Sequence, residues 1–166
     1  MDINKLSASF KVKKLTEENL DEMLALCRQN KIFYDYCPPA PTEESLQEDL
    51  FALPPNKTLA DKFFVGFYQK NNLVAICDLI LGYPNAATAF IGLFMMNTNF
   101  QGQGIGTQII QEICGYLKEL SFNFIQLAYV KGNPQSKAFW EKNGFLPTGI
   151  EKTMPEYTKI VMQKML

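Results

Sequence analysis

The stretch Asn99-Phe100-Gln101-Gly102-Gln103-Gly104-Ile105-Gly106-Thr107 joins an apolar run that ends near Met96 to a strongly amphipathic segment. In that segment apolar residues recur every four positions, which predicts a helix through Ile105, Ile109, Ile113 and Leu117. The three glycines of the turn leave no Cβ atom in the way of a closely approaching ligand. Backbone N–H groups in such a turn and at a helix start can converge on an anion, so we predict a pyrophosphate site here.

Other interpretations of this glycine turn fit less well. A Rossmann turn needs Gly-x-Gly-x-x-Gly, and counting from Gly102 the last position falls on Thr107. The helix is not followed by a parallel strand and an acidic residue spaced for a ribose, and the Gly-Lys-Ser/Thr of a P-loop is absent. A plain strand-to-helix turn stays open as an alternative, although three glycines exceed what such a turn requires.

The rest of the chain alternates between strand and helix patterns. We expect strands over 10–14, 63–68, 73–81, 88–96, 124–130, 146–152 and 157–166. Further helices are predicted after the caps Thr16 and Thr42 and over 134–142, with an aromatic loop over 30–41. This order predicts an α+β (mixed α/β) fold, or a mixed sheet with helices on both faces.

Composition excludes several classes of protein. The chain has no histidine, which rules out Ser-His-Asp and Cys-His catalysis and argues against most zinc or iron sites. With 16 basic and 17 acidic side chains, its net charge of -1 gives no general attraction to nucleic acid or an anionic membrane. We find no signal peptide and no apolar run of the ~20 residues a membrane helix needs, so we expect a cytoplasmic protein.

The four cysteines are scattered and form no Cys-x-x-Cys pair. Their pattern indicates neither a zinc site nor a disulfide framework, and we expect them to serve in packing. They are Cys27, Cys37, Cys77 and Cys114.

Two motifs in this order resemble those of the GNAT N-acetyltransferase superfamily. Gln101-x-x-Gly104-x-Gly106 resembles the family's pyrophosphate-binding signature, Gln/Arg-x-x-Gly-x-Gly/Ala. The segment from Asn133 to Phe145 is similar to the second motif, an Asn after a strand with a Gly-Phe about a dozen residues later. The resemblance covers essentially the whole chain, 1–166. It implies a single acyl-CoA N-acyltransferase domain with a central mixed, mostly antiparallel sheet of about seven strands and about four helices.

The resemblance also implies how a co-substrate, acetyl-CoA, binds without a metal. The strand ending near Met96 would splay from strand 124–130, and the pantetheine arm would pair with backbone around Phe94 and Met96. Asn133 and Ser136 would contact the cofactor from the other side, although a simple helix cap before Pro134 is the alternative for Asn133. Backbone amides of the turn would hold the pyrophosphate, namely those of Gln101, Gly102, Gln103, Gly104, Ile105, Gly106 and Thr107.

At the position of the family's usual proton donor, this sequence has a different residue. In many members a Tyr on the short helix protonates the departing thiolate, and the matching position, seven residues after Asn133, holds Trp140. An indole N–H donates a hydrogen bond but does not release its proton at a useful pH. Tyr129 or water is the remaining source of the proton, and we expect Trp140 to pack beside Phe139.

Asp78 is the best candidate for the base that deprotonates the acceptor amine. It lies in the apolar run Leu73–Leu81 and in strand spacing shares a face with Val74, Ile76 and Ile80. A carboxylate among such neighbours is costly to bury unless it is paired or functional, and burial would raise its pKa toward neutrality. A structural role as the partner of a buried Lys, Tyr or backbone N–H is the alternative.

The aromatic segment after residue 30 lies where the family covers its acceptor site. We predict that the loop Phe33-Tyr34-Asp35-Tyr36 forms a wall of the substrate site, with Tyr34, Asp35 and Tyr36 as substrate-binding residues and mere surface packing as the alternative. Asp35 would join Asp78 in favouring a cationic amine. Glu156 and Tyr157 precede the last strand and are weaker candidates to reach the same cleft.

The sequence therefore predicts an N-acetyltransferase that moves an acetyl group from acetyl-CoA to a primary amine of a small molecule, peptide or protein, as a monomer or homodimer. A catalytically weak acyl-CoA-binding regulatory module is the main alternative, because Trp140 replaces the usual Tyr. Transfer of a longer acyl chain is a third hypothesis, and it would need a wider cleft.

Overall fold

The computed structural model describes all 166 residues, and it contains a seven-stranded sheet in the order β1-β2-β3-β4-β5-β7-β6. The strands are β1 (Lys11–Lys14), β2 (Lys62–Gln69), β3 (Asn72–Leu81), β4 (Thr88–Met96), β5 (Phe124–Val130), β6 (Leu146–Thr153) and β7 (Thr158–Met165). The helices are α1 (Leu20–Gln29), α2 (Lys31–Tyr36), α3 (Glu43–Phe51), α4 (Ile105–Glu119) and α5 (Pro134–Lys142). Short 3-10 turns span Ile3–Leu6, Glu17–Asn19 and Thr98–Phe100.

The pairing of the strands confirms a mixed, mostly antiparallel sheet. Every neighbouring pair is antiparallel except β4 and β5, which run parallel and are connected by α4. A parallel pair needs such a crossover, because the chain must return from the end of the first strand to the opposite end of the sheet, where the second strand begins. All seven predicted strands are present near their expected positions.

One helix was not predicted from the sequence. The aromatic segment expected as a loop begins with α2, and the Cys37 N–H closes this helix on the Phe33 carbonyl at 2.9 Å. Pro38 and Pro39 follow at once, and proline cannot continue a helix. The protein therefore has five α-helices rather than about four.

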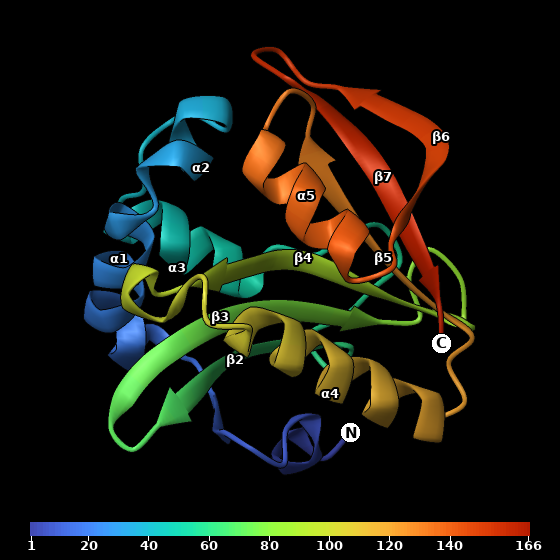
Figure 1. Cartoon of the computed structure of the whole chain (residues 1–166), viewed down its shortest axis with the longest axis horizontal. Coiled ribbons are helices and arrows are strands. Elements are labelled where there is room, and N and C mark those ends of the chain that lie inside the picture. The colour runs from blue at the N-terminus through green and yellow to red at the C-terminus, as the bar shows by residue number, and fades with distance from the viewer.

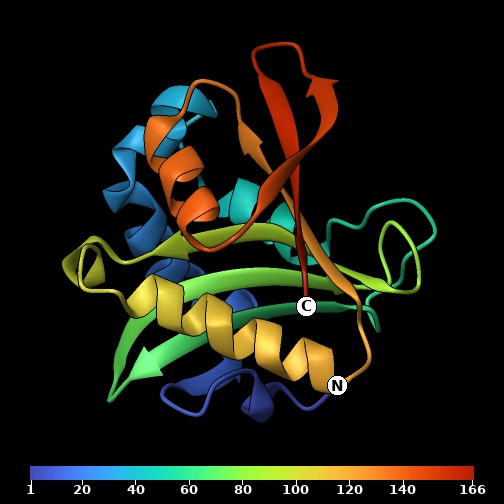
Figure 2. The same ribbon diagram turned by 45° about the vertical axis from the view of Figure 1, so that its right-hand side comes forward.

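The helices cover both faces of the sheet, which divides the core into two clusters. On one face α4 packs against the sheet through fully buried side chains such as Ile109, Ile113 and Leu117 (Figures 1 and 2). On the other face α1 and α3 contribute Met23, Leu26 and Leu46, among others. Each such side chain contributes about 1.5–3 kcal/mol by leaving water, so the sheet is held from both sides.

A bulge in β3 changes the predicted alternation around Asp78. Phe67 lies opposite Ala75 and Tyr68 lies opposite Leu73, so Val74 is the extra residue. Val74 packs in the α4 cluster, whereas Ile76 packs with α1 and α3. The expectation that Asp78 shares a face with Val74 was therefore wrong, because a single inserted residue reverses the period-two alternation.

A second bulge separates β4 from its parallel neighbour. Asp78 lies opposite Leu93 and Leu79 lies opposite Ile91, so Gly92 is the extra residue in β4. The pairing of β4 with β5 extends only from Thr88 to Ile91 and stops at this bulge. Beyond Gly92 the two strands diverge, as predicted, and α2 and α5 lie on either side of the opening (Figure 1). None of the helices combines the length and the apolarity needed to cross a bilayer.

Candidate active site

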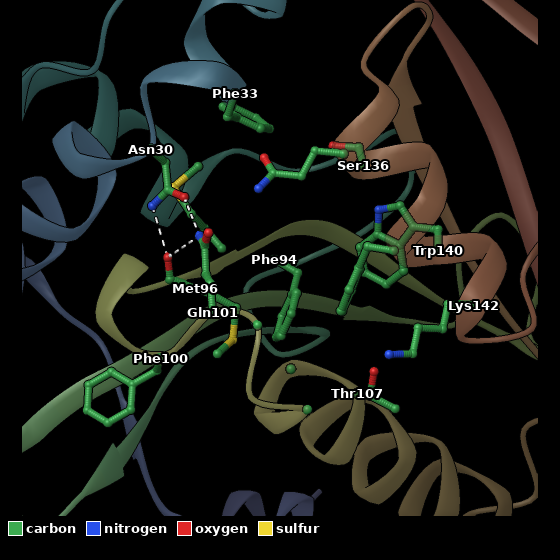
Figure 3. Close-up of a pocket in the computed structure, with 16 residues that line it drawn as sticks. Asn30, Phe33, Phe94, Met96, Phe100, Gln101, Thr107, Ser136, Trp140 and Lys142 are labelled. Carbon is green, nitrogen blue, oxygen red and sulfur yellow. Dashed lines mark hydrogen bonds between the residues drawn. The ribbon is translucent and has the colours of Figure 1, made fainter.

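Two adjoining clefts fill the space where β4 and β5 diverge. The outer cleft, with a volume of about 260 Å³, lies between the glycine turn, the end of β4 and α5 (Figure 3). The inner cleft, of about 90 Å³, lies between β4 and β5 themselves. The two share a set of lining side chains and therefore form one path: Phe33, Phe94, Ser136 and Trp140.

The glycine turn owes its shape to backbone angles that side chains disfavour. Gly102 and Gly104 have φ values of 73° and 81°, in the left-handed region, and a Cβ on either would meet no atom within 4 Å. Gly106 serves a different purpose, because a Cβ there would lie 3.2 Å from the Phe139 ring and 3.4 Å from the Met96 sulfur. Glycine at 106 thus lets α4 approach α5 and β4 closely.

The start of α4 presents unpaired donors to the outer cleft. The first regular helical bond runs from the Gln108 N–H to the Gly104 carbonyl at 3.0 Å, so the amides of Ile105, Gly106 and Thr107 have no helical partner. Gly104, Gly106 and Thr107 all line the outer cleft. Free amides at the positive end of a helix dipole form an anion-binding site.

Lys142 is the only charged side chain that lines the outer cleft. It projects from the end of α5 toward Thr107 on α4 (Figure 3), and it takes part in no ion pair of the protein. A cation that faces free amides across a cleft without carboxylates reinforces the preference for an anion. The sequence offered no signal for Lys142, because one lysine on a short helix is not distinctive.

Gln101 has a structural role that the motif alone did not reveal. Its side-chain amide donates to the Asn30 Oδ1 at 2.9 Å and to the Met96 carbonyl at 3.3 Å. Asn30 in turn donates to the carbonyls of Met96 at 2.9 Å and Leu26 at 3.0 Å (Figure 3). This network ties the turn to the ends of α1 and β4, and Asn30 is a site residue that sequence reasoning missed.

The backbone of β4 supplies free donors along the opening. The Asn97 N–H donates to the Val74 carbonyl at 2.8 Å, toward β3. Since successive residues of a strand point their backbone groups to alternate sides, those of Phe94 and Met96 point away from β3, toward the opening. The Met96 carbonyl is engaged by Asn30 and Gln101, so its N–H and the backbone of Phe94 remain available.

Trp140 forms the centre of an aromatic cluster in the wall between the clefts. Its ring lies 4.9 Å from that of Phe139, 5.1 Å from that of Phe145 and 5.9 Å from that of Phe94. Only 7% of the residue is exposed. The predicted packing of Trp140 beside Phe139 is confirmed, and such edge contacts stabilise a rigid wall.

Asn133 caps α5 and also lines the inner cleft. Its Oδ1 accepts from the Ser136 N–H at 3.0 Å, and Pro134 occupies the first helical position. The residue is buried, and both Asn133 and Ser136 face the cleft. Its role as a cap is therefore established, and its predicted contact with a cofactor is compatible with this position.

Asp78 is buried in an ion pair immediately behind the inner cleft. Its Oδ2 lies 2.7 Å from the Lys62 Nζ, and its buried Oδ1 has no partner. Burial raises the pKa of Asp78, although the Lys62 ammonium opposes that shift. Gly92 lines the inner cleft, and a Cβ on it would come within 2.5 Å of the Asp78 Oδ2. The absence of a side chain at Gly92 thus lets the Asp78 carboxylate pack directly against the backbone of the cleft wall.

Only part of the aromatic segment predicted to form a wall of the substrate site lines the clefts. Phe33 and Cys37 line the inner cleft, whereas Tyr34, Asp35 and Tyr36 line neither cleft. The reason is that the segment is helical, so residues four apart face the same way. Asp35 is exposed, and burial beside Cys27 raises the pKa of Tyr34.

The remaining predicted residues divide between the cleft and its surroundings. Tyr129 is buried and lines the inner cleft, together with Lys159 of β7, which the sequence did not single out. Burial, together with a hydrogen bond to Cys37, raises the pKa of Tyr157 to about 12. Glu156 is exposed and lines neither cleft. No group of three or more Cys, Asp or Glu side chains is arranged to hold a metal ion.

Three solved acetyltransferase structures are similar to this one. An acetyltransferase from Thermus thermophilus superposes with a TM-score of 0.76 and 20% identity over 100% of both chains. The PaiA N-acetyltransferase from Thermoplasma acidophilum, solved in complex with coenzyme A, gives 0.69 and 20% identity over 95% of this chain and 99% of its own. A ribosomal-protein-alanine N-acetyltransferase from Brucella melitensis gives 0.64 and 18% identity over 93% and 99%. At such identities the likeness shows the fold alone.

Sequence comparison identifies the family directly. No curated protein matches the chain. A profile of the Acetyltransferase (GNAT) family, however, matches residues 23–145, which contain the glycine turn, both diverging strands and α5. Because this match spans most of the chain and every element that lines the clefts except β7, the protein belongs to the GNAT family of acetyltransferases.

Proposed function

We propose that this protein is an N-acetyltransferase that moves an acetyl group from acetyl-CoA to a primary amine. The observation that carries the proposal is the set of free amides at the start of α4, which face a cleft whose one charged lining residue is Lys142. A diphosphate ester fits such a site, because amide donors and an ammonium stabilise its negative charge. The coenzyme A complex of a structural neighbour supports the same assignment.

The remainder of the cofactor fits along the path that the two clefts form. With the pyrophosphate held by residues 101–107, the pantetheine arm lies along β4, where the N–H groups of Phe94 and Met96 are available. Asn133 and Ser136 of α5 line the opposite side of the inner cleft. The thioester is thereby placed where the clefts meet, next to the aromatic wall of Trp140.

Asp78 is the proposed base for the acceptor amine. An alkyl ammonium has a pKa of ~10.4 in water and must lose a proton before it attacks a thioester. Asp78 has an unpartnered oxygen, packs against Gly92 of the cleft wall and has a pKa raised by burial, all of which favour proton acceptance. Lys62 would hold the carboxylate in place while it receives the proton.

The carbonyl oxygen and the departing thiolate require separate partners. As the thioester carbonyl becomes tetrahedral, a backbone N–H of the diverged β4 stabilises its negative oxygen. Tyr129 lines the inner cleft and is the candidate donor of a proton to the thiolate. A thiol with a pKa of ~8.5 is already a tolerable leaving group, so Trp140 in place of a Tyr is compatible with turnover.

An amine panel tests this function. The protein is incubated with acetyl-CoA and each amine, free thiol release is followed, and the acetylated product is identified by mass spectrometry. We expect thiol release that depends on the acceptor. Coenzyme A that binds without turnover across the panel would instead support a regulatory module, which Trp140 at the usual acid position favours.

A further inference from the structure

The inner cleft contains one charged side chain among otherwise neutral walls. Lys159 reaches it from β7, where it lies opposite Val130 of β5, which also lines the cleft. The other lining residues are apolar or uncharged and include Phe33, Leu127, Tyr129 and Trp140. Lys159 is half-buried, so its ammonium is partly shielded from water and lies where a ligand in the cleft can reach it.

No carboxylate of the protein forms an ion pair with Lys159. Its ammonium takes part in none of the four ion pairs, and its one defined contact is with the ring of Tyr157, 5.6 Å from the centroid. The carboxylate of Asp49 in α3 interacts electrostatically with the Lys159 ammonium. Desolvation raises the pKa of Asp49, and the ammoniums of Lys62 and Lys159 oppose that shift without either forming an ion pair with it.

The charge of Asp78 does not balance Lys159 either. Lys62 pairs with the Asp78 carboxylate at 2.7 Å, so this pair contributes little net charge to the cleft. Asp35, which was expected to attract a cationic amine, is exposed and lines neither cleft. Lys159 is therefore the one charged side chain that lines the end of the cleft where the acceptor would bind, which disfavours a second cationic group on the acceptor.

We propose that the acceptor is a small amino acid, whose carboxylate is held by the Lys159 ammonium while its amine lies at Gly92, in front of Asp78. This inference rests on the proposed function, because it assumes that the amine is deprotonated at Asp78. It follows from two groups on opposite sides of one small cleft, a carboxylate packed behind Gly92 of β4 and a cation of β7 that forms no ion pair. Amines without an anionic group leave the cation uncompensated.

The test compares amino acids with their amides, which keep the amine and remove the negative charge. For each pair, kcat/KM is measured by thiol release with the wild-type protein, K159Q and K152Q. Lys152 is the matched control, since it is exposed, lies opposite Lys159 in the β6–β7 ladder and lines neither cleft. A K159R variant that keeps the charge guards against a loss that is merely structural.

We expect the wild-type protein to prefer the acid over the amide. K159Q should lower kcat/KM for the acid by about tenfold or more, which is the effect of losing a charge-assisted hydrogen bond, and leave the amide within about twofold. K152Q and K159R should retain the preference. Coenzyme A affinity, measured by calorimetry, should be the same in all four proteins.

Three outcomes would overturn the inference. They are turnover of simple amines with no preference for a carboxylate, an equal loss for acid and amide in K159Q, and an equal loss of preference in K152Q. Each of these leaves the acetyltransferase function standing. Failure of the wild-type protein to bind coenzyme A in the same calorimetry would instead refute the proposed function, and this inference with it.

Discussion

At the scale of single residues, two effects act on the pKa of Asp78 in opposite directions. Burial raises its pKa and Lys62 opposes the rise, while Gly92 keeps its carboxylate next to the cleft. The sequence left two roles open, a base and a partner of a buried lysine, and the ion pair with Lys62 establishes the second. The free Oδ1 keeps the first as a proposal, because one oxygen of the carboxylate has no other partner.

The Asp78→Asn variant tests the role of base. An amide cannot accept the proton, so we expect kcat to fall by about a hundredfold or more, the usual contribution of a general base. Coenzyme A affinity should be unchanged in calorimetry, because Asp78 lines neither cleft directly. Wild-type turnover should decline as the pH falls through the raised pKa of Asp78. Normal turnover of the variant at every pH would exclude Asp78 as the base.

Removing Lys62 alone should destabilise the fold strongly. Lys62→Met leaves the Asp78 carboxylate buried without a counter-charge, and breaking a buried pair in this way costs about 3–5 kcal/mol. Since the unpaired Asp78 would then have a still higher pKa, it would bind a proton in the folded state more readily than in the unfolded state. The variant's stability should therefore increase as the pH is lowered toward the unfolded pKa of ~3.9.

Urea denaturation measures this free energy of unfolding. The double variant Lys62→Met/Asp78→Leu is the control, because an apolar pair of similar shape leaves no buried charge. We expect it to be more stable than Lys62→Met alone. Equal destabilisation of the single and double variants would show that the volume of these side chains matters and their charges do not.

At the scale of elements, the junction between the glycine turn and α4 determines the anion site. Two glycines with positive φ orient the turn, a third lets α4 approach Phe139 of α5, and Gln101 ties the turn to β4. The first turn of α4 is thereby left with free amides over the outer cleft. Each of these contributions is local in sequence, which is why the motif predicted the location of the site.

Two glycines of α4 and its turn should respond to the same substitution in opposite directions. Gly104→Ala forces an L side chain into the left-handed region and should destabilise the protein by about 1–2 kcal/mol. Gly115 lies within α4 with open space around it, so Gly115→Ala should stabilise by about 0.5–1 kcal/mol. Thermal denaturation measures both effects, and only Gly104→Ala should weaken coenzyme A binding. Equal behaviour of the two variants would contradict a special conformation at Gly104.

Because α5 faces α4 across the outer cleft, we can predict the effect of replacing Lys142. Lys142→Gln should weaken coenzyme A binding by about tenfold, the effect of losing a charge-assisted contact, and should reduce the dependence of binding on salt. Lys137→Gln is the control, because Lys137 is exposed on the same helix and pairs with Glu141 at 2.8 Å. Calorimetry at two salt concentrations distinguishes them, and equal affinities would remove Lys142 from the site.

At the scale of the whole molecule, the divergence of β4 and β5 opens the sheet. The pairing of the two strands stops at Ile91, and side chains from α2, α5 and β7 line the gap that follows. A ligand placed there joins elements that otherwise contact one another little. The folded state should bind it and the unfolded state should not, so the ligand stabilises the fold by mass action.

Coenzyme A should therefore raise the melting temperature. At a hundred times its dissociation constant a ligand adds about 2.7 kcal/mol, which for a chain of this length corresponds to a shift of about 5–10 °C. Adenosine, which lacks the pyrophosphate and the pantetheine arm, should give no shift at the same concentration. An identical shift with adenosine would mean that the clefts do not recognise the phosphates.

Local patterns were sufficient to predict the strands, the glycine turn and the cap at Asn133, because each depends on neighbours within a few residues. The residues of the aromatic segment that line the clefts were harder to predict. The aromatic segment was expected as a loop, so Tyr34, Asp35 and Tyr36 were selected as site residues. Of the predicted wall only Phe33 lines the clefts, together with Cys37 after it, because α2 turns both inward. The bulge at Val74 moved one expected neighbour of Asp78 to the opposite face for a similar reason.

By itself, the sequence determined the order of elements, the place of the anion site and the absence of a histidine from any mechanism, because these depend on periodicity, backbone freedom and composition. Tertiary structure alone decided which side chains meet. It brought Lys62 to Asp78, aligned Gly92 with that carboxylate, and set Lys142 and Lys159 in separate clefts. Lys62 and Asp78 are 16 residues apart, and Gly92 and Lys159 come from β4 and β7, so their proximity arises from strand register and bulges that no local pattern encodes.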